Sequence, residues 1–319
     1  MAMIRDEMRK AFHHKRCTPP DYKRLYSAIQ RMHRRFGNRK DPGALAIFGE
    51  SGCGKTTLSE DYFYKYCPYN NVSEAGKQKI HTVVWIEVPE YCTIRRFVTQ
   101  ICKRYGIPAP ATDNADQLKD AVLAAMKSAG TQLLIIDEAQ QFLSSNSVSG
   151  AKQVGHFVRH LMDASRVPFV FIGTPGYQAF IDADEPIRRR IKRRETMRGF
   201  TAPLEEKSIF HFTVLAMLKH LDDTCSRRLC SKLSSLELSQ RLYLMSGGRI
   251  GPVVDFFDQY IEDEIEESST KLTFGIPECL RAMECFDPPF EFHTSKPAFE
   301  LNRSSLPKLL TKYPSPEAQ

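Results

Sequence analysis

The sequence has no long hydrophobic segment. Its longest purely apolar runs, Leu133–Ile136 and Phe169–Ile172, are far shorter than the roughly 18 residues that a membrane-spanning helix needs. The N-terminal stretch MAMIRDEMRKAFHHKRC mixes acidic and basic side chains and has no apolar core, so it does not resemble a secretory signal. We therefore predict a cytoplasmic protein that makes no membrane contact.

Cysteine pairs with metal-ligand spacing are also missing. The nine cysteines include no Cys-x-x-Cys pair, which favours small, buried, reduced thiols over a zinc framework or a set of disulfides. His13 and His14 beside Cys17 offer a metal site only as an alternative to a solvated basic arm. No repeat with a period of 20 to 50 residues is visible, so a solenoid is not indicated.

The composition is that of a globular protein. With 319 residues, 42% hydrophobic and 26% charged, the chain is long enough for one large domain and a smaller appendage. The 45 Lys and Arg residues exceed the 38 Asp and Glu residues, which gives a net charge of +7. This excess is compatible with a polyanionic partner but is weak evidence alone.

Four regions differ in their patterns. Residues 1–40 are basic, with Leu25, Ile29 and Met32 at helical spacing, and predict a basic helical arm. Residues 41–202 alternate short apolar runs (ALAIF, TVVWIEV, QLLIID, VPFVFIG) with amphipathic stretches, which predicts a parallel sheet covered by helices. Residues 203–286 predict a small helical subdomain. Residues 287–319 are Pro-rich, and we expect this tail to lie outside the core.

Two of the helices in the second region have recognisable ends. Thr93 is a candidate N-cap for a helix whose apolar face runs from Ile94 to Tyr105, and Gly106 is its expected stop. A second helix is predicted from about Ala115 to Gly130.

The most specific motif is G-x-x-x-x-G-K-[ST]. It follows the strand ALAIF and opens a helix, so its backbone N–H groups can form an anion-binding nest at a helix N-terminus. We expect Lys55 to contact the β- and γ-phosphates of ATP and the Thr56 hydroxyl to ligate Mg²⁺. The predicted nucleotide-binding residues of this segment are Gly49, Glu50, Ser51, Gly52, Cys53, Gly54, Lys55, Thr56 and Thr57.

A second motif, Leu-Leu-Ile-Ile-Asp-Glu-Ala-Gln, ends an apolar strand with two carboxylates. Beside the phosphate loop, Asp137 is expected to bind nucleotide-associated Mg²⁺ and Glu138 to act as the general base that polarises the attacking water. The alternative, in which both residues only cap the next helix, is weakened by the phosphate loop upstream. The pair predicts ATP hydrolysis as well as binding.

Together these motifs resemble those of the AAA+ ATPases, and specifically of the transposition regulators called TnsC or TniB. Three segments carry the closer likeness: a Tyr-x-x-Leu and Met-His-Arg-Arg-Phe-Gly stretch before the first strand, FGESGCGKTTL, and FIGTPGYQAFIDADEPIRRRI. The resemblance covers roughly residues 20–265. It implies an α/β fold of the AAA+ P-loop NTPase type, with a central parallel sheet flanked by helices and followed by a helical lid.

The resemblance also implies roles for residues outside the two motifs. Thr174 matches the sensor 1 position near the γ-phosphate, where many AAA+ proteins have Asn. Arg189 and Arg190 match an arginine pair, one of which would be a finger that reaches the nucleotide of a neighbouring subunit. Arg249 resembles the sensor 2 arginine of the lid. For each arginine, the alternative is an ordinary surface charge.

Basic residues suggest where DNA would bind. The stretch Arg188–Arg198 holds seven bases in eleven residues, and either forms a subunit interface or follows a DNA backbone. The resemblance favours an interface for its first half. Candidates for DNA contact on the inner surface of a ring or helical filament, each weighed against a solvated helix face, are Lys103, Arg104, Lys119 and Lys152.

The resulting hypothesis is an ATP-dependent regulator of DNA transposition in bacteria. It would oligomerise on double-stranded DNA, in association with the nucleoid, and would connect a TniQ-type target selector with a TnsB-type transposase. The Pro-rich tail and the basic arm are the candidates for these contacts. One alternative is a replication-initiator or helicase-loader ATPase, although residues 265–319 look too short for the usual winged-helix reader. A non-catalytic scaffold is disfavoured by the presence of both Asp137 and Glu138.

Overall fold

The computed structural model describes two compact units. The described residues are 18–38, 41–73, 76–109, 114–143, 148–224, 228–231, 233–266, 271–284 and 296–313. The α/β unit comprises Asp21–Glu50 and Lys55–Met197. The helical unit comprises the described residues from Arg198 onwards, Thr18–Pro20 and, because of their contacts, Ser51–Gly54 of the loop after the first strand.

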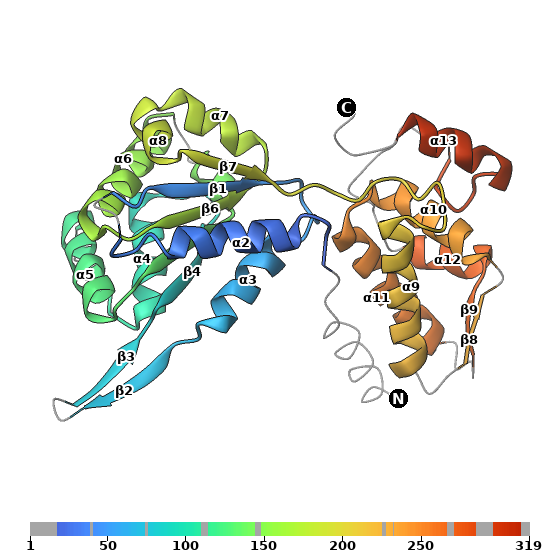
Figure 1. Cartoon of the computed structure of the whole chain (residues 1–319), viewed down its shortest axis with the longest axis horizontal. Coiled ribbons are helices and arrows are strands. Elements are labelled where there is room, and N and C mark those ends of the chain that lie inside the picture. Colours follow the sequence, from blue (N-terminus) through green and yellow to red (C-terminus); the bar gives the residue numbers. More distant parts are fainter. Residues whose placement is uncertain are drawn as a thin grey trace. The chain divides into compact units, whose positions relative to one another are not determined.

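A five-stranded parallel sheet forms the centre of the α/β unit (Figure 1). Its strand order is β4 (Val83–Glu87), β5 (Leu133–Asp137), β6 (Phe169–Gly173), β1 (Ala44–Phe48) and β7 (Arg193–Thr196). Strands β1, β5 and β6 are buried along their whole length, as expected for a parallel sheet covered on both faces. The four strands predicted from the apolar runs are confirmed.

The fifth strand, β7, was not predicted. Within the basic stretch Arg188–Arg198, only the first three arginines lie on a helix, and Arg193–Thr196 then pairs in parallel with β1. The side chains of β7 are only partly buried, so this edge strand does not need the continuous apolar run of a strand that is covered on both faces. The stretch is therefore a short helix followed by an edge strand.

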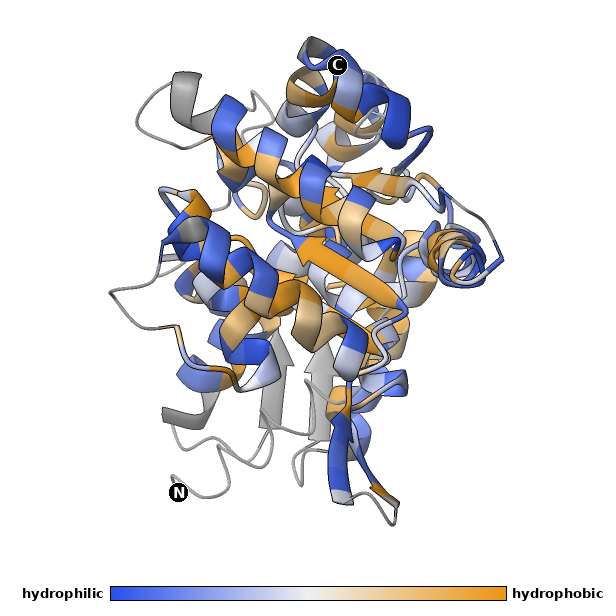
Figure 2. Cartoon of the chain, turned by 90° about the vertical axis from the view of Figure 1, so that its left-hand side faces the viewer, coloured by the Kyte–Doolittle hydropathy of each residue, from blue (hydrophilic) through white to orange (hydrophobic). Residues whose placement is uncertain are grey.

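The helices of this unit are α3 (Lys55–Lys65), α4 (Ile94–Tyr105), α5 (Ala115–Ser128), α6 (Val148–Ser165), α7 (Gly176–Ala183) and α8 (Glu185–Arg190), with the 3₁₀ helix η1 (Ala139–Leu143). The predicted ends of α4 are confirmed, since Thr93 accepts a hydrogen bond from the Arg96 N–H and Gly106 has φ +68°. Figure 2 shows helices that are hydrophobic on one side and hydrophilic on the other around a hydrophobic strand.

Helix α2 (Tyr22–His33) is part of the α/β unit rather than of a separate arm. The helix is present as predicted, and Leu25, Ile29 and Met32 are buried. These side chains form an apolar stripe that must be covered, and α2 packs against β1, β6 and α3. Arg24 also donates a hydrogen bond of 2.7 Å to the Thr196 carbonyl in β7. Residues 1–17, with the basic cluster around His13, His14 and Cys17, lie outside the described residues.

A two-stranded hairpin projects between α3 and β4 (Figure 1). It consists of β2 (Tyr69–Ser73) and β3 (Gly76–Ile80), which pair antiparallel. The side chains of β3 are mostly exposed, so the hairpin lacks the apolar alternation that predicts a strand. The hairpin therefore could not be predicted from the pattern of apolar residues.

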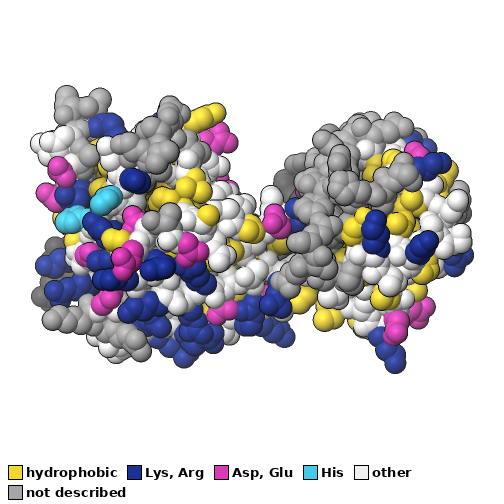
Figure 3. Space-filling view, turned by 90° about the horizontal axis from the view of Figure 1, so that it is seen from above, with side chains coloured by type: hydrophobic (Ala, Val, Ile, Leu, Met, Phe, Trp, Pro, Cys, Tyr) yellow, Lys and Arg dark blue, Asp and Glu magenta, His cyan; other side chains and the backbone are white. Residues whose placement is uncertain are grey.

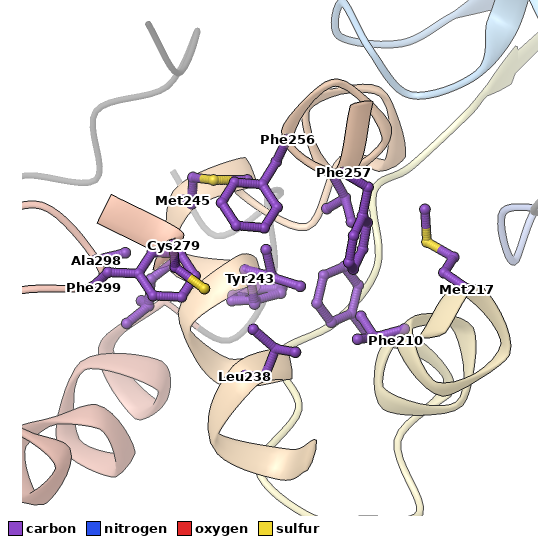
Figure 4. Packing of buried hydrophobic residues seen from close by; sticks show 14 of the residues in the cluster. Phe210, Met217, Leu238, Tyr243, Met245, Phe256, Phe257, Cys279, Ala298 and Phe299 are labelled. Carbon is purple, nitrogen blue, oxygen red and sulfur yellow. The ribbon is translucent and has the colours of Figure 1, made fainter. Parts of the chain in front are cut away.

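The helical unit contains α9 (Ile209–Thr224), α10 (Ser235–Ser246), α11 (Ile250–Glu266), α12 (Ile276–Glu284), the 3₁₀ helix η2 (Arg303–Ser305) and α13 (Leu306–Lys312). Two short strands, β8 (Arg228–Ser231) and β9 (Lys271–Phe274), pair in parallel. The helices pack around Tyr243, whose ring lies 5.5 Å from that of Phe210 (Figure 4). None of the described helices has the length and apolar character needed to cross a membrane.

The prediction that residues 287–319 lie outside the core is wrong for their described part. Residues 296–313 pack into the helical unit, where the Phe299 ring stacks on that of Phe256 with centroids 5.5 Å apart. Arg241, buried in an ion pair with Glu237, donates hydrogen bonds to the Ala298 and Leu301 carbonyls. Pro307 lies in the first turn of α13, where proline is tolerated, and the apolar side chains of Phe299, Leu306 and Leu310 complete the core.

Candidate functional site

The predicted phosphate loop joins β1 to α3. At its start, the Gly49 N–H donates a hydrogen bond of 3.1 Å to the Gly173 carbonyl at the end of β6. Gly52 and Gly54 have φ values of +79° and +92°, a left-handed conformation that favours glycine. Because α3 begins at Lys55, the N–H groups of its first turn have no acceptor within the helix and point toward the loop, as an anion site requires. The loop thus has the backbone that a phosphate cradle requires.

Lys55 is buried within this loop. Its side chain is 5% exposed, and its Nζ donates a hydrogen bond of 2.8 Å to the Glu50 carbonyl. An ammonium group buried in a loop that leads into a helix N-terminus suits a ligand rich in negative oxygens. The residue is therefore placed as predicted for a phosphate contact.

Asp137 and Thr56, the two predicted Mg²⁺ ligands, are brought together. Asp137 is 1% exposed, and this burial raises the pKa of its carboxyl group to about 6, although the Thr56 hydroxyl donates a hydrogen bond to the carboxylate and opposes the shift. The Ser59 hydroxyl also lies 3.4 Å from Asp137 Oδ2. A carboxylate and a hydroxyl are oxygen ligands of the kind Mg²⁺ prefers, so the residues fit the metal.

Glu138 and Thr174 are joined through Gln140. The Gln140 Nε2 donates a hydrogen bond to Glu138 Oε2, and the Thr174 N–H donates one of 3.0 Å to Gln140 Oε1. The predicted general base and the predicted sensor 1 residue therefore belong to one network. Sequence reasoning did not select Gln140, and its only signal is the position two residues after Glu138.

Two of the four candidate DNA-contact residues lie near this network. A cavity of about 510 Å³ is lined by Glu138, Lys103 and Arg104 among others. The Arg104 guanidinium group lies 5.1 Å from the ring centroid of Trp85, whose Nε1 donates a hydrogen bond to the Ser59 hydroxyl. The other two candidates do not line this cavity: Lys119 is ion-paired with Asp116 on α5, and Lys152 is exposed on α6.

Arg249, in the helical unit, contacts the phosphate loop through its backbone. Its Nη1 donates a hydrogen bond of 3.0 Å to the Ser51 carbonyl, and its side chain is buried. Two residues further on, the Gly251 N–H donates a hydrogen bond of 2.8 Å to the Gly52 carbonyl. Arg249 thus holds residues of the predicted phosphate loop, and its contact with the phosphates themselves stays a prediction.

The family model described as "Bacterial TniB protein" matches residues 13–198, more than half of the chain. The chain belongs to the TniB family. Family membership and the complete pair of nucleotide motifs identify this TniB protein as an AAA+ ATPase, as its sequence predicted. A comparison with curated proteins finds no match.

Solved structures share the fold of this TniB protein. The ORC2 protein of Aeropyrum pernix, in ADPNP and ADP complexes, has a TM-score of 0.60 at 15% identity, over 88% of this chain and 72% of that one. Cdc6p of Pyrobaculum aerophilum has a TM-score of 0.59 at 13% identity, with coverages of 85% and 68%. The A. pernix ORC1 protein in complex with DNA has a TM-score of 0.61 at 12% identity, with coverages of 86% and 68%. At such identities the likeness shows the AAA+ architecture alone.

The two predicted finger arginines differ in their surroundings. The Arg190 guanidinium group donates two hydrogen bonds, of 2.7 and 2.6 Å, to the Asp163 carboxylate of α6. Arg189 pairs, among the residues that the structure describes, with Glu185, one turn earlier in the same short helix, and its side chain is 74% exposed. Of the pair, Arg189 is the one whose position suits contact with another molecule.

The burial of Asp137 leads to a prediction for the nucleotide-free TniB protein. A pKa raised from 3.8 to about 6 corresponds to about 3 kcal/mol against the charged carboxylate. In the unfolded chain this group loses its proton at lower pH, so its contribution to the unfolding free energy falls as the pH rises from about 4 to above 6. We expect Asp137→Asn to raise the unfolding free energy at pH 7.5 by about 1 to 3 kcal/mol.

Urea unfolding at pH 5 and pH 7.5 measures this effect. The increase in unfolding free energy caused by Asp137→Asn is expected to be smaller at pH 5, where Asp137 is already protonated. The exposed Asp120→Asn on α5 makes the same chemical change and should leave stability within about 0.5 kcal/mol. A loss of stability in Asp137→Asn at neutral pH would contradict the interpretation that burial dominates at this carboxylate.

Proposed function

We propose that this TniB-family ATPase is an ATP-dependent switch in DNA transposition, which assembles on double-stranded DNA and is released by hydrolysis. The observation that supports this most is the network at the carboxyl ends of β5 and β6, where Asp137, Glu138, Gln140 and Thr174 lie together in a chain whose family is TniB. Such a network can respond to the state of the nucleotide as well as bind it.

Each site residue has a role in hydrolysis. Lys55 binds the β- and γ-phosphates, and Thr56 and Asp137 hold Mg²⁺, which neutralises phosphate charge when bound. Glu138 accepts a proton from the attacking water, and Thr174 contacts the γ-phosphate or that water. Arg249 senses the phosphates from the lid.

Assembly would complete the site. Arg189 of one subunit acts as the finger for the nucleotide of the next, so ATP bound between subunits stabilises a ring or helical filament. The exposure of Arg189 supports this role, whereas the two hydrogen bonds from Arg190 to Asp163 assign Arg190 to its own subunit. The finger makes turnover depend on assembly.

DNA would bind through phosphate contacts. In the face that Figure 3 shows, Lys and Arg side chains gather on the α/β unit, at left, and are sparser on the helical unit. Lys103 and Arg104 are the favoured contacts because they line the cavity that Glu138 also lines. A TniQ-type target selector and a TnsB-type transposase are the proposed protein partners, and the bacterial nucleoid is the proposed location.

One observation favours a second candidate, a replication-initiator or helicase-loader ATPase. The solved structures that share the fold include ORC and Cdc6 proteins, one of them in complex with DNA. A requirement for a TnsB-type transposase rather than for a replicative helicase distinguishes the two candidates in a reconstituted reaction.

ATP turnover with and without double-stranded DNA tests the proposal. We expect DNA to stimulate turnover, and the double variant Lys103→Glu with Arg104→Glu to reduce the slope of log affinity against log salt by about 2. A matched control, Lys207→Glu with Lys219→Glu, changes the same charge at exposed sites of the helical unit. Equal DNA affinity and equal stimulation of turnover by DNA in the wild-type protein, the Lys103/Arg104 variant and the control would refute the placement of the DNA contact.

A further inference from the structure

Gln140 connects Glu138 and Thr174, which directly follow the different strands β5 and β6. It lies in η1 directly after β5 and is only partly exposed. We propose that Gln140 is a positioning residue for ATP hydrolysis, which aims the Glu138 carboxylate and ties it to the end of β6 at Thr174. This inference rests on the proposed role of Glu138 as general base.

The two hydrogen bonds of the Gln140 amide fix its orientation. Its NH₂ group faces the Glu138 carboxylate, which only accepts, and its oxygen faces the Thr174 N–H, which only donates. A reversed amide would bring two acceptors together at Glu138 and two donors together at Thr174. The amide therefore has one arrangement that satisfies both neighbours, and this arrangement sets the position of Glu138 Oε2.

Glu138 is also held through its backbone. Its φ of +54° is unusual for a residue other than glycine, and its N–H donates a hydrogen bond of 2.9 Å to Asp137 Oδ1. The backbone is thus fixed by the metal-binding carboxylate, and the side chain by Gln140. The pair of contacts leaves Glu138 Oε1 as the oxygen for the attacking water.

The neighbouring strand provides space for Gln140. A Cβ atom at Gly173 would lie 2.8 Å from Gln140 Oε1 and 3.3 Å from the Gln140 backbone nitrogen. The Gly173 carbonyl also accepts the hydrogen bond from Gly49 at the start of the phosphate loop. A shift of this strand end on nucleotide binding would therefore be transmitted to the Gln140 amide and, through it, to Glu138.

Steady-state kinetics of two Gln140 variants test the inference. Gln140→Met keeps the volume and removes both hydrogen bonds, whereas Gln140→Glu keeps the acceptor for Thr174 and removes the donor to Glu138. We expect kcat to fall about 10- to 100-fold in both, and the Kd for a non-hydrolysable ATP analogue to stay within about twofold. The matched control Gln178→Met, at an exposed glutamine of α7, should keep the wild-type kcat.

A second way to disturb the Gln140 amide is to add a Cβ atom beside it with Gly173→Ala, alone and combined with Gln140→Ala. We expect Gly173→Ala alone to lower kcat. The kcat of the double variant should be no more than about threefold below that of Gln140→Ala, because both changes disrupt the same interaction. Wild-type kcat in Gln140→Met, or retained kcat in Gln140→Glu, would overturn the inference. If Glu138→Gln itself keeps full turnover, the proposed general base is wrong; if only the Gln140 variants do, the proposed function stands without this residue.

Discussion

Glu138→Gln is expected to lower ATP turnover by at least about 100-fold while ATP binding is retained. The substitution keeps the size of the side chain, and its amide oxygen can still accept the hydrogen bond from Gln140. It removes the carboxylate that is proposed to accept the proton of the attacking water. The proposed phosphate contact, Lys55, and the proposed metal ligands, Thr56 and Asp137, are unchanged, so the variant should accumulate in the ATP-bound state.

Phosphate release and binding of a fluorescent ATP analogue measure the two effects separately. A matched control is Glu90→Gln, an exposed carboxylate that lines the same cavity as Glu138, and it should keep the wild-type rate. Unchanged turnover in Glu138→Gln would remove Glu138 from the proposed mechanism. A parallel loss of ATP binding would instead assign it a role in nucleotide affinity.

Arg189→Ala is expected to lower the DNA-stimulated turnover by about 1,000-fold, the lower end of the effect of an arginine finger. The side chain is 74% exposed and, within the described part of the chain, its ion pair is with Glu185 of its own helix, so its removal should leave the fold intact. Arg190→Ala, by contrast, breaks the pair with Asp163 and should cost about 1 kcal/mol of stability, with a much smaller loss of turnover.

A mixing experiment shows whether Arg189 acts between subunits. A Lys55→Ala chain is expected to lose phosphate binding but still to present Arg189, whereas an Arg189→Ala chain is expected to bind ATP but to lack the proposed finger. We expect a mixture of the two inactive proteins to regain turnover, because each ATP-bound subunit can contact an Arg189 from a Lys55→Ala neighbour. A mixture as inactive as its components would place Arg189 outside the interface.

The fold could be predicted where an apolar run is followed by a motif, such as the phosphate loop or a pair of carboxylates. Each of the buried strands β1, β5 and β6 is an apolar run, and the loop after β1 has a spacing that few other functions require. Strand β7 and the hairpin β2–β3 could not be predicted, because their residues are polar or exposed and their structure depends on pairing with neighbours.

The outer parts of the chain illustrate a second limit. Helix α2 was predicted correctly, but nothing in its basic sequence showed that its apolar stripe would pack on the sheet. In the C-terminal segment, proline content suggested a loose tail, whereas Phe299 and Leu310 complete the core of the helical unit. Packing between segments distant in sequence decided both cases.

The same limit applies within the site. Lys55, Thr56, Asp137 and Glu138 were predicted from two local motifs, and the structure places Thr56 beside Asp137. Gln140 was missed because its importance comes from Thr174, which lies 34 residues later in the sequence and meets it only when β5 and β6 pair. Contacts of this kind depend on the register of the sheet.

In the proposed switch, triphosphate binding at Lys55 and assembly on DNA are coupled. Electron microscopy in the presence of double-stranded DNA tests this coupling directly. The three samples are the wild-type protein with a non-hydrolysable ATP analogue, the wild-type protein with ADP, and Lys55→Ala with the analogue. We expect rings or filaments with the analogue and separate subunits in the other two conditions. Separate subunits in all three conditions, or the same assemblies whatever the nucleotide, would contradict it.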